Sequence, residues 1–396
     1  MNRLGNLIQS LCPDGLEYKT LGEICDITRG RVMSKNYIRE NEGVYPVYSS
    51  QTGNKGIFGY IKTFDYDCES ITWTTDGANA GSVFYHKNEK FSITNVCGLL
   101  RLKDAVRSSM KFVYYSLQVF TKNYVSDGMG NPKLMSNAMM KVIIPIPPLP
   151  IKQEIVRILD TFTALEAELE AELEKRKAQY EHYRNELLTF GDDTLIISLG
   201  EMLQPKGYIR GPFGSALKKE YFVGNGVPVY EQQHAIYGKR EFRYFIDDKR
   251  ADTLKRFLVK PQDLIISCSG TIGRISIIDQ KDPEGIINQA LLILRLNLSK
   301  VLIKYVKYYL EAFPNLIICS TGGAITNIEK REVIEGIKIP LPPLEEQKRI
   351  VATLDRFDAL VNDIAQGLPA EITARRKQYE YYRDKLLTFK RKEAVV

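Results

Sequence analysis

Two stretches of the chain carry apolar residues at helical spacing over a long distance. In the earlier stretch these positions are Phe162, Leu165, Leu169, Leu173, Tyr180, Tyr183 and Leu187. In the later stretch they are Ile350, Leu354, Phe357, Val361, Ile364, Leu368, Ile372, Tyr379, Tyr382 and Leu386. Steps of mostly three and four residues are typical of helices that pack along a seam, so each stretch is predicted to form a long helix in a coiled coil. Gly367 and Pro369 should kink or split the later helix.

The two helices belong to an internal repeat. Residues 144–162, IPIPPLPIKQEIVRILDTF, return at 339–357 as IPLPPLEEQKRIVATLDRF, with 10 of 19 positions identical. Residues 176–190, RKAQYEHYRNELLTF, return at 375–389 as RRKQYEYYRDKLLTF, with 10 of 15 positions identical. In both copies a pair of prolines ends an extended segment and lets a helix begin just beyond it. Residues 165–172, LEAELEAE, repeat a four-residue unit that is close to one helical turn.

The segments before each helix, roughly 15–143 and 192–338, share landmarks in one order although their identity is low. Short β-branched and aromatic runs separated by Gly, Asn and Asp turns predict strands. One amphipathic helix per segment is expected, near 109–121 and 301–312, and a further short helix should follow Thr326, whose spacing to Glu329 fits a capping box. The predicted fold class is therefore α+β: two β-rich segments and two long helices in a pseudo-twofold internal repeat.

Composition and charge narrow the function classes only a little. A chain of 396 residues is expected to form more than one domain. It has no apolar run of 18 residues and no signal-peptide core at its start, which predicts a cytoplasmic protein without a membrane span. The six cysteines are scattered and are expected to be buried thiols. The net charge of +7 suits a polyanion partner without proving one.

A search for catalytic motifs finds none that fits. PDGLEYK at 13–19 has the letters of a PD…ExK nuclease, but a gap of two residues is too short to place the acidic groups on neighbouring strands. GMGN at 128–131 and SGTIGR at 269–274 match neither phosphate-loop order and are expected to be turns. The three histidines are far apart in sequence. We therefore expect no catalytic residue, no metal site and no cofactor.

The proline bracket, the LEEQKRIV helix start and the RRKQYEYYRDKLLTF ending together resemble the specificity subunit of type I restriction–modification systems. The LEAELEAE tandem fits this family as well, whereas LPIKQE in the first copy departs from the usual LEEQ. The resemblance implies a target-recognition domain at 1–143 with a short N-terminal helix, a central conserved helical region at 144–191, a second target-recognition domain at 192–338 and a C-terminal conserved helical region at 339–396.

The resemblance also implies the partners and the division of labour. In this family each target-recognition domain reads one half of a split site in double-stranded DNA. Two long antiparallel helices space these domains and dock two methyltransferase subunits, and motor–nuclease subunits join for cleavage. The low identity between the two domains predicts two different half-sites, so the whole site should be asymmetric.

Residues that contact DNA are expected on loops, with Lys and Arg at phosphates and polar side chains at base edges. The candidates in the first domain are Arg29, Arg31, Lys35, Ser49, Ser50, Gln51, Asn54, Lys55, Asn131 and Lys133. The candidates in the second domain are Arg210, Ser215, Lys218, Lys219, Gln232, Gln233, His234, Lys239, Arg240, Arg243, Ser269, Thr271 and Arg274. Two alternatives stay open: a stand-alone nuclease or methyltransferase with a divergent motif, and a coiled-coil adaptor that does not contact DNA.

Overall fold

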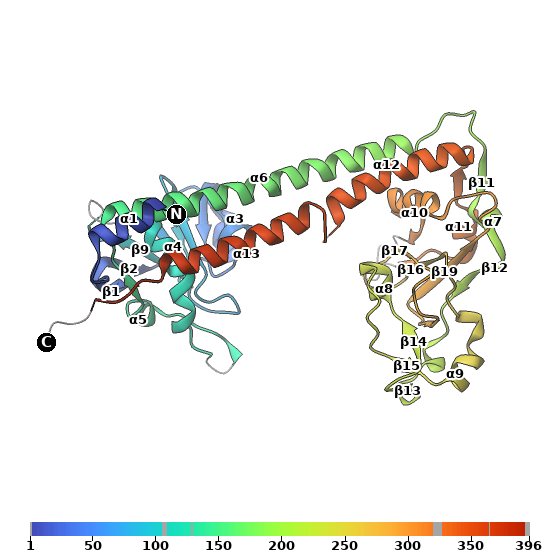
Figure 1. Cartoon of the computed structure of the whole chain (residues 1–396), viewed down its shortest axis with the longest axis horizontal. Coiled ribbons are helices and arrows are strands. Elements are labelled where there is room, and N and C mark those ends of the chain that lie inside the picture. The colour runs from blue at the N-terminus through green and yellow to red at the C-terminus, as the bar shows by residue number, and fades with distance from the viewer. Residues whose placement is uncertain (1, 105–108, 128–129, 320–326, 364, 393–396) are drawn as a thin grey trace. The chain divides into compact units, whose positions relative to one another are not determined.

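The chain folds into two compact units. The structure, a computed structural model, describes residues 2–104, 109–127, 130–319, 327–363 and 365–392 (Figure 1). Unit 1 comprises Met1–Glu170 and Glu371–Val396, and unit 2 comprises Ala171–Ala370. Each unit therefore contains one β-rich region together with parts of the long helices.

Unit 1 builds its β-rich region from two four-stranded sheets, ordered β2-β9-β6-β7 and β4-β3-β8-β5, and the two-stranded β1-β10. Its elements in chain order are α1 (Asn2–Leu11), β1 (Tyr18–Thr20), α2 (Leu21–Ile24), β2 (Cys25–Arg29), α3 (Lys35–Glu40), β3 (Glu42–Tyr48), η1 (Gly53–Gly56), β4 (Ile57–Ile61), β5 (Tyr66–Asp67), β6 (Ser70–Thr74), β7 (Val83–His86), β8 (Lys90–Ile93), β9 (Cys97–Leu102), α4 (Met110–Phe120), η2 (Thr121–Tyr124), α5 (Ser136–Met139) and β10 (Ile143–Pro145).

Unit 2 repeats this plan with sheets ordered β12-β19-β16-β17 and β13-β15-β14-β18, and with the two-stranded pairs β11-β22 and β20-β21. Its elements in chain order are β11 (Ile196–Ser198), α7 (Leu199–Met202), β12 (Leu203–Arg210), η4 (Gly214–Ala216), η5 (Lys219–Tyr221), β13 (Phe222–Val223), β14 (Val227–Tyr230), α8 (Gln232–Tyr237), β15 (Phe245–Ile246), α9 (Asp248–Thr253), η6 (Lys255–Phe257), β16 (Asp263–Ser267), β17 (Ile275–Ile277), β18 (Ile286–Ile287), β19 (Leu291–Leu296), α10 (Ile303–Ala312), η7 (Pro314–Leu316), β20 (Ile318–Cys319), β21 (Asn327–Ile328), α11 (Arg331–Gly336) and β22 (Lys338–Pro340).

The repeat extends to strand direction and register. The strand formed by the PVY sequence pairs in parallel with a later strand in both units, Tyr48 opposite Ile93 and Tyr230 opposite Ile287. The other ladders of these four-stranded sheets are antiparallel. The central strands β6 and β16 are buried along their whole length, which explains their runs of β-branched and aromatic residues. The predicted α+β fold with an internal repeat is confirmed.

Local signals explain several of the helix starts, and one predicted start was too early. The helices predicted near 109–121 and 301–312 are α4 and α10. Thr326 lies outside the described residues. A short helix does follow it, α11, but this helix begins only at Arg331, with Lys330 as its N-cap, because Asn327–Ile328 form strand β21. Capping boxes open α2, α7 and α8, where Glu23, Glu201 and His234 each accept the N–H of the N-cap residue.

The earlier long helix is continuous and the later one is split, as predicted. Helix α6 (Leu149–Leu187) runs for 39 residues, whereas α12 (Leu344–Asn362) and α13 (Leu368–Leu387) are separate helices (Figure 1). At the break the carboxylate of Asp363 accepts the N–H groups of Ala365 and Gln366, which substitutes for the helical ladder. Gly367 fits this turn because a Cβ there would lie 2.5 Å from the Ala359 carbonyl oxygen.

Within each unit, α6 packs against the later helices in an antiparallel direction. In unit 1, Phe162 stacks on Tyr382 at 5.5 Å between ring centroids, and Arg376 pairs with both Glu166 and Glu170. In unit 2, Tyr183 stacks on Phe357 at 5.5 Å. Because residue numbers rise along α6 as they fall along its partner in unit 1, the two helices run in opposite directions.

A three-residue contact, which we call the anchor, fixes the β-rich region to a long helix in each unit. In unit 1, Asp160 on α6 accepts a hydrogen bond from Tyr115 (2.5 Å) and pairs with Lys111 (2.7 Å), both on α4. In unit 2, Asp355 on α12 contacts Tyr308 and Lys304 on α10, each at 2.7 Å. Burial and the adjacent carboxylate raise the pKa of both tyrosines, so the hydroxyl stays a donor.

The two ends of the described chain meet in unit 1. The Leu16 N–H donates to the Lys390 carbonyl oxygen, and the Lys392 N–H donates to that of Leu16, each at 2.9 Å. Helix α1, the short N-terminal helix expected from the sequence, packs with Leu4 against Ile151 and Ile155 of α6. The six cysteines are free thiols; four are buried, as predicted, whereas Cys68 and Cys319 are partly exposed.

Candidate nucleic-acid interface

In unit 1 the loop after strand β6, residues 75–81, brings several of the predicted DNA-contacting segments together. Asn79 donates to the hydroxyl of Thr52 at 3.0 Å, which ties this loop to the segment that follows the PVY strand. The Gly77 N–H donates to the side-chain oxygen of Asn131 at 3.1 Å, which ties it to the GNPK segment. Segments that lie more than 50 residues apart in the sequence thus form one loop cluster.

Arg29 holds this cluster from the side of strand β2. Its guanidinium donates to the Asn95 carbonyl oxygen at 3.0 Å and to the Thr75 hydroxyl at 3.3 Å, and a further nitrogen lies 3.8 Å from the sulfur of Met135. Because these donors are already used within the chain, Arg29 positions loops in this structure. The residue after Arg29 is Gly30, where a side chain would not fit, because a Cβ there would lie 2.0 Å from the Ile93 carbonyl oxygen.

The other candidate side chains of unit 1 differ in their exposure and in the contacts that they make within the chain. Arg31 pairs with Asp65 at 3.1 Å, and the Ser49 hydroxyl accepts a hydrogen bond from Thr94 at 2.9 Å. Asn54 and Lys55 have φ angles of 48° and 53°, so the chain turns sharply at these two exposed residues. Ser50 is partly exposed. The remaining exposed candidates are Lys35, Gln51, Asn131 and Lys133.

Unit 2 places an equivalent cluster between helix α8 and the SGTIGR loop. Ser269 donates to the side-chain oxygen of Gln232 at 3.2 Å, and the side-chain nitrogen of Gln232 lies 3.2 Å from the position that a Cβ would take at Gly270. Thr271 and Arg274 are exposed on the same loop. The two segments that the sequence singled out therefore lie side by side.

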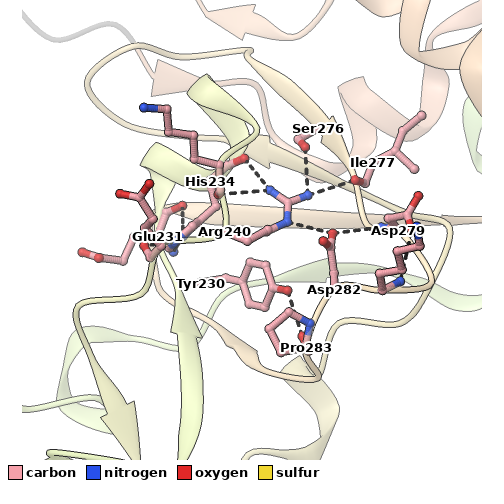
Figure 2. A network of polar contacts seen from close by, with 12 residues as sticks. Tyr230, Glu231, His234, Arg240, Ser276, Ile277, Asp279, Asp282 and Pro283 are labelled. Atoms are coloured by element: carbon pink, nitrogen blue, oxygen red, sulfur yellow. Dashed lines mark hydrogen bonds and ion pairs between the residues drawn. The ribbon is translucent and has the colours of Figure 1, made fainter. Parts of the chain in front are cut away.

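Two of the predicted contacts, His234 and Arg240, already use their polar atoms inside unit 2 (Figure 2). His234 is 1% exposed; its Nδ1 accepts the Glu231 N–H at 2.7 Å and its Nε2 lies 3.0 Å from the Glu241 carbonyl oxygen. Burial lowers the pKa of His234, so the ring is held neutral. Neither ring nitrogen is free for a base.

The N–H groups of the Arg240 guanidinium are also used within unit 2. Its side chain is 17% exposed and pairs with Asp282 at 2.7 Å. It also donates to the His234 carbonyl oxygen at 3.1 Å, to the Ser276 hydroxyl at 3.1 Å and to the Ile277 carbonyl oxygen at 3.0 Å (Figure 2). Arg240 thus joins the end of α8 to strand β17, which is a structural role.

The remaining candidates of unit 2 lie nearer the surface. Arg243 is 63% exposed and binds the carboxylate of Glu231 through two nitrogens, at 2.8 and 3.2 Å, while Gln233 donates to the same carboxylate at 3.3 Å. Lys218 lies 3.7 Å from Glu220. Arg210, described below, is partly buried at the end of β12. The exposed candidates that complete the set are Ser215, Lys219 and Lys239.

Sequence reasoning missed two parts of these clusters. The first is the loop at 75–81, the centre of the unit 1 cluster, which contains none of the predicted contact residues. The second is Phe213, which is 90% exposed in the GPFG turn beside Arg210. Large apolar residues are usually buried, so an aromatic residue between two glycines and a proline was a signal that could have been used.

The chain matches known proteins over nearly its whole length. A family model described as the type I restriction modification DNA specificity domain matches residues 13–175 and 214–374. A protein of Mycoplasma pneumoniae named as a type I specificity subunit is 29% identical over 374 residues, which cover 92% of this chain and 95% of that protein. The specificity subunit of the Escherichia coli type I restriction enzyme EcoR124I/EcoR124II is 30% identical over 386 residues, which cover 93% of this chain and 88% of that protein.

Solved structures show the same fold. A chain from a structure of a type I restriction–modification system superposes with a TM-score of 0.61 at 17% identity and covers 95% of this chain and 98% of its own length. The S subunit of M. genitalium gives a TM-score of 0.54 at 15% identity, with 94% of this chain and 96% of that chain covered. In the part of the chain that the structure describes, no helix is both long and apolar enough to cross a membrane. The matched domains, the relatives and the repeated fold together place the chain in the type I restriction–modification DNA specificity family, whose members supply the DNA sequence specificity of these systems.

Proposed function

We propose that each β-rich region reads one half of an asymmetric, bipartite site in double-stranded DNA. One observation carries the proposal: the two units place loop clusters at equivalent points of the same sheets, after the PVY strand and after the central strand β6 or β16. The side chains at these points differ between the units. Because the two β-rich regions share one fold but carry different side chains in these loops, we expect them to bind two different half-site sequences.

Different polar groups are available in the two clusters. Unit 1 offers Gln51 and Asn54 after its PVY strand, whereas unit 2 offers Gln232 and Gln233. Amide side chains can pair with the edge of adenine, and arginine or lysine with that of guanine. The exposed lysines of both units would contact phosphates and so set the position of the protein on the duplex.

The chain should act with other subunits and catalyse nothing itself. We propose that α6, α12 and α13 dock two methyltransferase subunits, and that motor–nuclease subunits complete the cleaving complex. The name of the Escherichia coli relative, a specificity subunit of a restriction enzyme, supports a role beside catalytic partners. The complex would work in the cytoplasm, where bacterial DNA lies.

Methylation mapping of the whole genome, with and without this gene, tests the proposal. The expected result is a motif of two different half-sites with a fixed gap, methylated only when the chain is present with its methyltransferase partner. A continuous motif, or no change in methylation, would contradict it. Binding of the assembled complex to this duplex should weaken steeply as salt rises, whereas a coiled-coil adaptor would not bind the duplex.

Measuring turnover by the chain alone distinguishes the proposed function from the remaining alternative, a stand-alone nuclease or methyltransferase. The purified chain should neither cleave DNA with Mg²⁺ nor methylate it with S-adenosylmethionine. Activity that survives removal of the partner subunits would instead support a stand-alone enzyme.

A further inference from the structure

A basic, aromatic pocket opens beside the end of strand β12 in unit 2. Its volume is about 810 Å³, and we call it the Arg210 pocket. Three guanidinium groups and three aromatic rings line it, and none of the described residues in its lining is an acid. These six residues are Tyr208, Arg210, Phe213, Arg256, Phe257 and Arg331. Arginine and aromatic rings without a neutralising carboxylate favour an anionic, flat ligand such as a nucleotide strand.

The repeat shows that Arg210 is unusual. Arg210 ends β12 as Arg29 ends β2, and both precede a glycine. Thr75 and Cys268 also correspond, because their N–H groups donate to equivalent carbonyl oxygens, those of Val96 and Ala290. In unit 1 the Thr75 hydroxyl accepts a hydrogen bond from Arg29. In unit 2 the thiol of Cys268, a weak acceptor, stands in that place.

As a result, the guanidinium of Arg210 has only the weak thiol acceptor of Cys268 in that place and keeps one nitrogen that the described residues do not use. Its Nη1 is buried and has no hydrogen-bond partner among the described residues. A buried donor without an acceptor is costly, and native proteins seldom keep one without a use. Arg331 differs, since it pairs with Glu335 at 2.8 Å, whereas Arg256 forms no ion pair within the described residues. The pocket therefore keeps unneutralised positive charge.

Phe213 is the most exposed of the apolar residues that line this pocket. It is 90% exposed, the highest value among the large apolar residues that the structure leaves exposed. The turn that carries it is fixed close to strand β18, because a Cβ at Gly211 would lie 1.8 Å from the Asn288 carbonyl oxygen. An exposed ring on a fixed turn can stack on a base or enter between base pairs.

The pocket is continuous with the loop cluster described above. Ser269 lines the pocket and also donates to Gln232 at 3.2 Å. We propose that the Arg210 pocket reads the half-site of unit 2, with Phe213 packed against a base and Arg210 bonded to the acceptor edge of a guanine. The planar fork of arginine matches the O6 and N7 atoms of guanine, which makes this the commonest specific contact in the major groove. The inference rests on the proposed function and adds its reading residues.

The test uses the complex of this chain with its methyltransferase partners and the duplex whose motif the wild-type complex methylates. Arg210→Lys keeps the charge and removes the fork, and Phe213→Ala removes the ring. Val32→Ala is the matched control, because Val32 follows Arg29 by three residues as Phe213 follows Arg210, and it is 78% exposed. Affinity is measured over a range of salt concentrations, and the methylated motif is mapped for each variant.

For Arg210→Lys we expect affinity for the duplex to fall about 10- to 100-fold and one position of a single half-site to become degenerate, with an unchanged salt slope. For Phe213→Ala, which alters an exposed side chain and should fold, we expect a loss of about 10-fold or more. Val32→Ala should change neither affinity for that half-site nor its motif.

Two results would overturn the inference. One is wild-type affinity and motif for both Arg210→Lys and Phe213→Ala. The other is a uniform loss of affinity for all sequences with a shallower salt slope in an Arg210→Ala variant, since that is the behaviour of a phosphate contact. A wild-type complex that methylates no bipartite motif would instead remove the proposed function, so the two failures are distinguishable.

Discussion

At the scale of single residues, the sequence singled out several loops that lie side by side, but not which of their side chains remain available. Gln232 and Ser269 were both expected at the interface, and they are in contact. Arg240 and Arg243 are three residues apart and look alike in the sequence, yet their side chains are 17% and 63% exposed. The difference depends on Asp282, 42 residues further along the chain, which local patterns cannot place.

This contrast gives a prediction for stability. Arg240→Ala should lower the free energy of unfolding by about 2–4 kcal/mol, because it leaves Asp282 without its ion-pair partner and removes four further hydrogen bonds. Thermal unfolding of the full chain, followed by circular dichroism, measures the change.

Arg243→Ala is the matched control, since the Arg243 guanidinium is 63% exposed, although its partner Glu231 is buried, and an ion pair open to solvent on one side contributes less than an enclosed one. Its unfolding midpoint should stay near that of the wild type, whereas its DNA binding is the property to examine. Equal destabilisation by the two substitutions would show that the Arg240 network does not stabilise unit 2.

At the scale of elements, the periodicity of apolar residues predicted the long helices well because their packing is local and regular. The split after Asn362 also followed from Gly367 and Pro369. The short helix after Thr326 is present as α11, but the capping-box pattern placed its start too early, because Asn327 and Ile328 belong to strand β21. Short elements depend on partners elsewhere in the chain, so local signals decide them less often.

The tandem LEAE units lead to a prediction about the gap between half-sites. Glu166 and Glu170 hold the same place in successive units, and Arg376 pairs with both, so an inserted unit would supply an equivalent carboxylate. One added unit lengthens α6 by about 6 Å. Because B-DNA rises about 3.4 Å per base pair, the gap should widen by one or two base pairs.

Mapping the methylated motif of an insertion variant measures this gap. Both half-sites should stay unchanged, because no residue of either β-rich region is altered. A changed half-site with the original gap would refute the idea that the repeat sets the spacing.

At the scale of the whole molecule, the internal repeat made the two-part organisation visible in the sequence, and the family resemblance placed the function. The domain boundaries at 143, 191 and 338 stay predictions. The two compact units are divided at other places, after Glu170 and after Ala370, so that each unit contains parts of the long helices. Sequence similarity marks what was copied, whereas compactness marks what packs together, so the two divisions need not coincide.

The anchors test how equivalent the two units are. Asp160→Ala and Asp355→Ala should each lower the free energy of unfolding by about 1–3 kcal/mol, because each leaves a buried tyrosine hydroxyl without its acceptor. Chemical denaturation of the full chain measures both. If only one of the two substitutions destabilised the chain, the anchors would differ in strength despite their shared geometry.

The shared anchor also has an evolutionary consequence. A lysine, a tyrosine and an aspartate attach each β-rich region to its helix in one pattern, and none of the three belongs to a predicted reading loop. Recombination between related genes could therefore replace one β-rich region by another that makes the same anchor contact with the helix. New target sequences would then arise by exchange of whole β-rich regions, without any change in the helices that we propose to bind other subunits.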